Sequence, residues 1–184
     1  MDAGHVVARL RAAVPGAEME TAESVDQPAI IVPAGRLHDV LAALRGPGLA
    51  FEFLSDLTAV DWWPAEPRFE VVYHLASFEH RTRLRVKVRV GGDDARLPTA
   101  SDIWPAADWL EREVWDLFGI VFDNHPDLRR LLMPEDWVGH PARKDYPVQI
   151  KEPVKVYAPL QLTEAEFQAN IKADRDARGG TRES

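Results

Sequence analysis

The sequence predicts an α+β domain followed by an extended, proline-rich C-terminal tail. Apolar residues recur at helical spacing in some segments and at strand spacing in others, so the first part of the chain combines helices and strands. Beyond about residue 122, prolines recur too often for long regular elements. The length of 184 residues suits one domain with an appendage. We therefore predict a domain over residues 1–122 and a docking segment over residues 123–184.

Helices are indicated where apolar residues fall on one face of a 3.6-residue period. The first two predicted helices end at proline and glycine, and the third ends at Gly119, because glycine often follows the last helical turn. The third is so apolar that we expect it to be covered on most sides. A short final helix is expected to begin near Thr163. The three longer helices are predicted over residues 3–14, 33–45 and 106–118.

Strands are indicated by short apolar runs and by alternation of apolar and polar residues. The most regular alternation places Leu84, Val86, Val88 and Val90 on one face and Arg83, Arg85, Lys87 and Arg89 on the other. We interpret this as a sheet with one face on the core and one in water. A nucleic-acid-binding strip and the docking of an acidic partner on the cationic face are the alternatives. Residues 91–105 are expected to form a loop. The predicted strands are 18–23, 28–32, 49–62, 69–78 and 82–90.

Composition excludes several classes of function. The chain has no cysteine, so it cannot form disulfides or ligate an iron–sulfur cluster or structural zinc through its own thiolates. A net charge of −8 disfavours nucleic-acid binding, because affinity for phosphate requires local positive charge. No apolar run approaches the roughly 20 residues of a membrane-spanning helix, and the N-terminal residues lack the apolar core of a secretory signal.

The stretch from His125 to Pro147 is rich in histidine and charged residues, the side-chain types that catalyse reactions or bind metals. His125 and His140 could bind a metal together with Asp127 or Asp136, and an independent metal or acid–base enzyme using His125, His140 and Asp136 is the distant alternative. Neither histidine belongs to an i, i+4 pair of ligands. Each precedes a proline, which favours a turn in which the imidazole bonds backbone groups. We therefore predict no catalytic site, cofactor site or metal site in this chain.

Charged residues of the helix at 106–118 are interpreted as structural. Residues two apart on a helix point roughly 200° apart, so Glu111 and Glu113 cannot act on one substrate. We expect each to pair with an arginine, and Arg112, Arg129 and Arg130 are the nearest in sequence. The structural ion-pairing set comprises Glu111, Arg112, Glu113 and Asp116.

Arg129 and Arg130 are predicted to lie on a short helical turn that runs from His125 to about Met133. Neighbours on such a turn point about 100° apart. We expect one arginine to turn inward to a glutamate of the preceding helix and the other to face a partner.

The tail beyond Leu131 combines apolar residues with too little local structure to fold alone. It must lie along its own domain or along another protein. Extended, the stretch from Leu131 to Leu160 would reach about 100 Å, which favours a partner surface. We expect residues from about Leu131 onward to be more mobile in the isolated protein than in a complex.

The same region carries a family resemblance. The stretch ADWLEREVWDLFGIVFDNHPDLRRLLMPEDWVGHPARKDYP resembles the signature of the C subunit of the proton-translocating NADH:quinone oxidoreductase, respiratory complex I. The upstream stretches SDLTAVDWW, RFEVVYHLASF and TRLRVKVRV resemble the central strands of that family, so the resemblance covers about residues 49–149. Asp108, Asn124 and Ala142 depart from the family pattern. Asn124 stands where the family has glycine, and asparagine tolerates a positive φ best among the other residues.

The resemblance implies a two-layer domain of helices on a mixed β-sheet. It implies a non-catalytic structural subunit of the hydrophilic arm, bound mainly to the D subunit and also near the B and I subunits. NADH, FMN, iron–sulfur clusters and the quinone would belong to other subunits. The location would be the cytoplasmic side of the bacterial inner or plasma membrane, with membrane contact only through the complex.

A partner interface is expected in the tail, and the near alternative is the equivalent subunit of a membrane-bound energy-converting hydrogenase. The expected interface comprises Asp127, Arg129, Arg130, Asp136, Trp137, His140, Arg143, Lys144, Asp145 and Tyr146.

Overall fold

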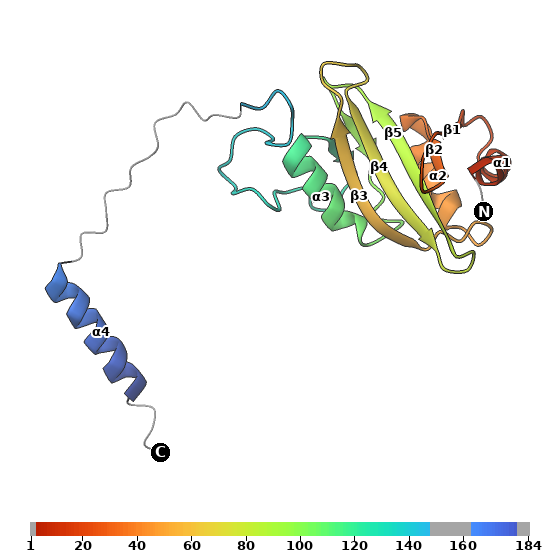
Figure 1. The fold of residues 1–184 in the computed structure, drawn as a ribbon. Helices are drawn as coiled ribbons and strands as arrows, with labels where there is room; N and C mark the ends of the chain where they lie inside the picture. Colours follow the sequence, from red (N-terminus) through yellow and green to blue (C-terminus); the bar gives the residue numbers. More distant parts are fainter. Residues whose placement is uncertain (1–2, 148–162, 180–184) are drawn as a thin grey trace. The chain divides into compact units, whose positions relative to one another are not determined.

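The computed structural model describes residues 3–147 and 163–179 (Figure 1). The chain divides into two compact units, Met1–Tyr146 and Pro147–Ser184. The boundary therefore lies after Tyr146 and not between residues 122 and 123 as we expected. Residues 123–146 belong to the first unit because, as described below, they bond to its last helix and to one of its hairpins. Predictions about residues 148–162 concern residues outside the described part of the chain.

The first unit is built on a five-stranded mixed sheet with the order β1-β2-β5-β4-β3. Strands β3, β4 and β5 are antiparallel neighbours, and β2 pairs in parallel with β5. The α+β fold with a mixed sheet is confirmed. The strands are β1 (Glu20–Ala22), β2 (Ala29–Ile31), β3 (Phe53–Asp61), β4 (Phe69–Ser77) and β5 (Thr82–Val90).

Helices of the first unit share one apolar core with the sheet. Side chains of α1, α2 and α3 join a single cluster with the inward residues of β4 and β5. Figure 1 shows α1 and α2 at the β1–β2 side of the sheet and α3 beside β3. The predicted second helix starts as a 3₁₀ turn before it becomes α-helical. The helical elements are α1 (Ala3–Ala13), η1 (Ala34–Arg36), α2 (Leu37–Arg45) and α3 (Ala107–Phe118).

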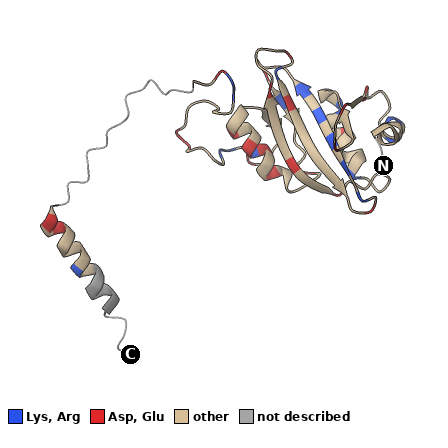
Figure 2. Cartoon of the chain, in the orientation of Figure 1, with Lys and Arg blue, Asp and Glu red and all other residues tan. Residues whose placement is uncertain are grey.

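The β4–β5 hairpin confirms the predicted alternation. Leu84, Val86 and Val88 are fully buried, and the cations of β5 alternate with them along the strand (Figure 2). Lys87 Nζ lies 2.9 Å from Glu70 Oε1, and Arg89 Nε lies 3.2 Å from Glu70 Oε2. Glu70 of the neighbouring strand thus provides a carboxylate for two cations of β5. This favours a water-facing surface over a docking site for an acidic partner.

Two short elements were missed by the sequence analysis. Strand β6 (Arg96–Pro98) lies within the expected loop 91–105 and pairs in parallel with β7 (Val121–Asp123). The two strands flank α3 in the sequence. Each spans three residues, too few to produce a detectable period in the sequence. The predicted helical turn from His125 to Met133 is wrong, since the chain there forms turns and bends.

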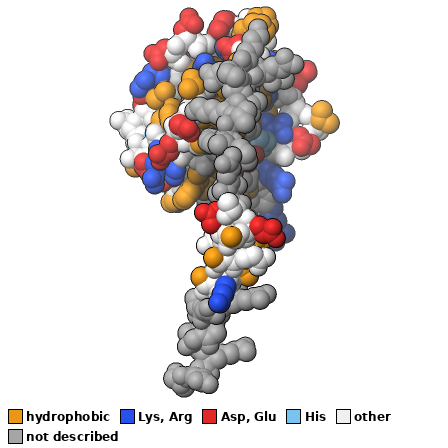
Figure 3. All heavy atoms as spheres, turned by 90° about the vertical axis from the view of Figure 1, so that its left-hand side faces the viewer, with side chains coloured by type: hydrophobic (Ala, Val, Ile, Leu, Met, Phe, Trp, Pro, Cys, Tyr) orange, Lys and Arg blue, Asp and Glu red, His pale blue; other side chains and the backbone are white. Residues whose placement is uncertain are grey.

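The second unit contains the predicted final helix, α4 (Glu164–Gly179). Thr163 and Glu166 form a reciprocal cap: Glu166 N–H donates to Thr163 Oγ1 at 3.3 Å, and Thr163 N–H donates to Glu166 Oε2 at 2.9 Å. Figure 3 shows acidic side chains at the start of this helix, where the helix dipole favours them. Among the described residues, no helix is long and apolar enough to cross a bilayer.

Candidate partner interface around helix α3

Helix α3 carries buried charge on a mostly covered surface. Apart from Trp109, which is 60% exposed, every residue of the helix is buried or partly buried. This confirms the expectation that the helix is covered on most sides. Glu111, Arg112 and Asp116 are buried and must therefore find polar partners.

Asp116 binds the chain that follows the helix. Its Oδ2 accepts the backbone N–H groups of Leu131, Leu132 and Met133 at 3.0, 2.8 and 2.8 Å, and its Oδ1 lies 2.6 Å from Arg130 Nη1. Burial alone would raise the pKa of Asp116, but these N–H donors and the guanidinium hold that pKa below its ordinary value. Three successive N–H groups directed at one carboxylate replace the helical turn that we predicted for this stretch.

Residues 140–143 cap the C-terminus of α3. The last carbonyl groups of a helix have no partner within it. His140 Nδ1 donates to the carbonyl of Asp116 at 3.0 Å, Ala142 N–H to that of Leu117 at 3.0 Å, and Arg143 Nε to that of Phe118 at 2.6 Å. The segment containing GHPARKDYP is thus held on its own domain by the end of α3.

Gly119 allows this close approach. It adopts φ 78°, and a Cβ atom there would lie 2.6 Å from His140 Cδ2. The positive φ after a helix is the common glycine C-cap. Asn124, the departure from the family glycine, likewise has a positive φ of 64°.

Arg68 anchors the end of the segment to the β3–β4 hairpin. Its guanidinium lies 2.8 Å from Asp61 Oδ2 and 2.7 Å from Asp145 Oδ1, and Lys144 N–H donates to Asp61 at 2.8 Å. Burial would raise the pKa of Asp61, but the bonds from Arg68 and from the backbone N–H groups of Lys144 and Trp63 keep that pKa well below its ordinary range. The sequence analysis missed Asp61 and Arg68, because nothing local shows that residues 61 and 145 meet.

Both histidines bond backbone groups, as predicted. His125 Nε2 lies 3.0 Å from the carbonyl oxygen of Asp108, and its Nδ1 accepts the N–H of Asp127 at 3.1 Å. His140 is directed to Asp116, as described above. Among the described residues, no group of three or more histidines and carboxylates is arranged to hold a metal ion.

Glu111 does not pair with an arginine of the described chain, contrary to our expectation. Its side chain is fully buried and accepts the hydroxyl of Thr99 at 2.5 Å and the N–H of Ala100 at 2.6 Å. The nearest ring nitrogen, His125 Nε2, is 3.9 Å away. Burial raises the pKa of Glu111 to about 7.

The remaining members of the predicted ion-pairing set also differ from expectation. Arg112 donates to the carbonyl oxygens of Arg129 and Arg130, and Glu113 forms no ion pair within the described chain. Asp116 does pair with an arginine, Arg130. The inward arginine is therefore Arg130, but its partner is an aspartate and not a glutamate.

Several residues of the predicted interface are used within the first unit. Arg130, His140, Arg143 and Asp145 bond α3 or the hairpin, and the ring of Tyr146 stacks on that of Trp137 at 6.4 Å. Arg129 is the outward arginine; its side chain is 70% exposed and pairs with Asp127 at 2.8 Å. Asp136 and Lys144 are also exposed. The exposed members are those that can meet a partner, and their role in binding stays a prediction.

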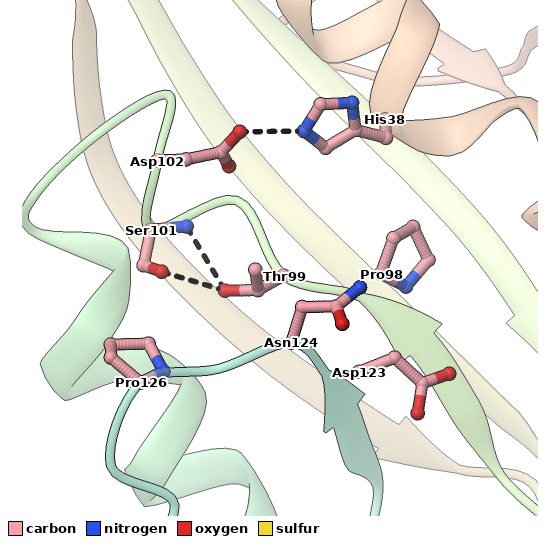
Figure 4. A pocket seen from close by; sticks show the side chains of 8 residues that line it. All are labelled: His38, Pro98, Thr99, Ser101, Asp102, Asp123, Asn124 and Pro126. Atoms are coloured by element: carbon pink, nitrogen blue, oxygen red, sulfur yellow. Dashed lines mark hydrogen bonds and ion pairs between the residues drawn. The ribbon is translucent and has the colours of Figure 1, made fainter.

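An open hollow of about 560 Å³ lies between β6, β7 and α2 (Figure 4). His38 Nε2 binds Asp102 Oδ2 at 2.8 Å, and Thr99 bonds Ser101 at 2.9 Å. Asp123 instead pairs with Arg96. The polar side chains of the hollow thus bond in separate pairs and do not converge on one point.

Comparisons with known proteins agree on one family. Residues 30–152 match the family described as respiratory-chain NADH dehydrogenase, 30 Kd subunit. The NADH-quinone oxidoreductase C subunit of Roseiflexus sp. (strain RS-1) is 47% identical over 153 residues, covering 83% of this chain and 88% of the relative. The NADH-quinone oxidoreductase C/D subunit of Nitrosospira multiformis is 43% identical over 163 residues, covering 83% of this chain and 27% of that longer protein.

Solved structures are also similar. The trypsin-resistant fragment (1–134) of Nqo5 is 36% identical with a TM-score of 0.59, covering 70% of this chain and all of the fragment. A chain of the membrane-bound sulfane sulfur reductase, an archaeal respiratory membrane complex, is 30% identical with a TM-score of 0.61, covering 84% of this chain and 98% of that chain. The protein belongs to the family of the 30 kDa subunit of respiratory-chain NADH dehydrogenase, which includes the C subunits of bacterial NADH-quinone oxidoreductases.

Proposed function

We propose that this chain is a non-catalytic structural subunit of the hydrophilic arm of an NADH-quinone oxidoreductase, where it braces the quinone-site and iron–sulfur subunits. The proposal rests on the charged residues of the first unit, which bond to each other and to the backbone and thereby stabilise the fold. The side chains of Asp61, Arg68, Asp116 and Arg130 form ion pairs and hydrogen bonds that hold residues 130–145 on the domain. Such bonds build a fixed surface, and electron transfer requires that neighbouring centres be held at fixed distances.

The D subunit is the proposed main partner. The relative from Nitrosospira multiformis is named as a C/D subunit, so sequences of this family occur joined to the D subunit in one chain. Contacts with the B and I subunits follow from the family resemblance alone. We further propose that NADH, FMN, the iron–sulfur clusters and the quinone bind to other subunits. The chain would then sit on the cytoplasmic side of the membrane and reach it only through the complex.

The test is assembly in a bacterium whose own gene for this chain has been deleted. Restoring the tagged gene is expected to return the chain to a large complex on native gels, together with NADH:quinone activity in membranes. Mass spectrometry of the purified complex identifies the neighbouring subunits. A chain that remains free while NADH:quinone activity is normal would contradict the proposal.

A second candidate function is the equivalent subunit of another membrane-bound energy-converting complex, such as a hydrogenase. The similarity to a chain of the archaeal sulfane sulfur reductase favours it. The same purification distinguishes the two functions. Recovery of the D subunit of a quinone reductase supports the first, whereas a large subunit with nickel-binding cysteines supports the second.

A further inference from the structure

A groove of about 340 Å³ lies between α3 and the chain that follows β7. Its apolar surface comes from Trp115 and Leu128, while its polar surface is dominated by guanidinium groups. The residues that line it are Arg112, Trp115, Leu128, Arg129, Arg130 and Glu135.

Arg112 is a buried cation that has no carboxylate partner within the described chain. It is 7% exposed, and its Nε and Nη2 donate to the carbonyl oxygens of Arg129 and Arg130, each at 3.2 Å. No carboxylate among the described residues forms an ion pair with Arg112. Burying a charge is costly unless an opposite charge compensates it. The other two arginines of the groove already have carboxylate partners, Asp116 and Asp127.

Aromatic surface adjoins this cation. The guanidinium of Arg112 lies over the ring of Trp109, 5.0 Å from its centroid, and Trp109 is 60% exposed. Leu132, from the segment bound by Asp116, is 59% exposed. Figure 3 shows hydrophobic, basic and acidic side chains exposed on the side of the first unit where α3 lies. Tryptophan and arginine dominate the binding energy of protein interfaces, and a net charge of −8 argues against nucleic acid as the ligand.

We propose that this groove receives a carboxylate side chain from a neighbouring protein of the complex, with Arg112 as the anchoring cation. Arg129 lines the same groove, and its side chain is 70% exposed. It supplies the second donor, since a guanidinium binds a carboxylate through two N–H groups. An apolar residue beside that carboxylate packs on Trp109. This inference rests on the proposed function, which supplies the neighbouring protein.

The first experiment places a photo-reactive phenylalanine derivative at position 109 of the full chain and irradiates the assembled complex. The expected product is a cross-link to one other subunit within a few residues of an Asp or Glu. A complex that contains the chain but yields no cross-link to another subunit overturns the inference and leaves the proposed function standing. A chain that enters no complex contradicts the proposed function instead.

Charge reversal gives the second experiment. Arg129→Glu introduces an anion into the groove. Arg36→Glu is the control, because Arg36 is a partly exposed arginine, 43% exposed at its side chain, that also pairs with a nearby aspartate, Asp39. Arg129→Glu is expected to reduce assembled complex at least about tenfold at low ionic strength, where charges are least screened, whereas Arg36→Glu behaves as wild type. Reversing the cross-linked acid of the partner to arginine should restore assembly with Arg129→Glu. Equal assembly of both variants, with unchanged melting of the free chains, would refute the groove as the binding site.

Discussion

Two adjacent arginines have opposite roles, and the difference follows from burial. Arg130 is 15% exposed at its side chain and pairs with the fully buried Asp116, whereas Arg129 is 70% exposed and pairs with the half-exposed Asp127. An exposed pair contributes about 0–1 kcal/mol, since water screens it. A buried carboxylate that loses its cation is stranded in a low-dielectric environment.

Arg130→Ala is therefore expected to lower the free energy of unfolding by about 3–5 kcal/mol. Arg129→Ala should change it by less than about 1 kcal/mol. Urea unfolding of the two purified variants beside the wild type measures both values. Similar losses for the two variants would mean that Asp116 is held by the three backbone N–H groups without help from the guanidinium.

Glu111 makes stability depend on pH near neutrality. Its pKa is raised from 4.5 to about 7 in the folded chain, so the neutral acid is favoured by folding. The resulting stabilisation is complete below pH 4.5 and is lost as pH rises through 7. A shift of this size corresponds to roughly 3 kcal/mol between those limits. The lowered pKa values of Asp61, Asp116 and Asp145 act below this window, because their unfolded value is 3.8.

Glu111→Gln mimics the neutral acid and is expected to flatten the fall in unfolding free energy between pH 4.5 and about 8. Glu113→Gln is the control on the same helix, since Glu113 is partly exposed and has no ion pair within the described chain. Urea unfolding at several pH values provides the measurement. A Glu111→Gln variant with the wild-type pH slope would show that another group titrates in this window.

At the scale of elements, the C-terminus of α3 and residues 140–143 form one structural feature. Gly119 is required at this position for two reasons. Its φ of 78° is left-handed, and a Cβ atom there would contact the ring of His140. Gly119→Ala is expected to cost about 1–3 kcal/mol of unfolding free energy. Gly35→Ala is the control, since a Cβ there meets nothing within 4 Å and its φ is not in the left-handed region. Comparable melting temperatures for the two variants would contradict this coupling.

Helices and strands whose apolar residues recur with a clear period were predicted from the sequence, and elements without such a period were not. The β4–β5 hairpin and α3 emerged from alternation and helical spacing, with ends close to those observed. Strands β6 and β7 were missed because each is short and pairs across α3. The inward and outward arginines were predicted correctly as a pair. The carboxylate partner of the inward arginine was not predicted correctly, because three backbone N–H groups bond Asp116 in place of the assumed helical turn, a contact between residues distant in sequence.

At the scale of the whole molecule, residues 131–146 change our view of the tail. We expected residues from about Leu131 onward to be more mobile in the isolated protein than in a complex. Yet Leu131, Met133, Ala142 and Lys144 donate their backbone N–H groups to the first unit. Hydrogen exchange on the isolated chain should therefore show these amides protected to an extent comparable with those of α3. Rapid exchange at these four amides, with α3 protected, would restore the original expectation of ordering on binding.

The isolated chain is expected to carry out no redox chemistry of its own. Without cysteine it cannot ligate an iron–sulfur cluster through its own thiolates, and buried charges such as Asp61, Arg68 and Asp116 are occupied in holding the fold. The purified chain is therefore expected to show no NADH or quinone oxidoreductase activity and no visible absorbance. Membranes containing the assembled complex are the positive control, assayed with the same donor and acceptor. Bound flavin or a cluster spectrum in the pure chain would contradict the structural role, because a brace needs rigidity and interfaces but no redox centre of its own.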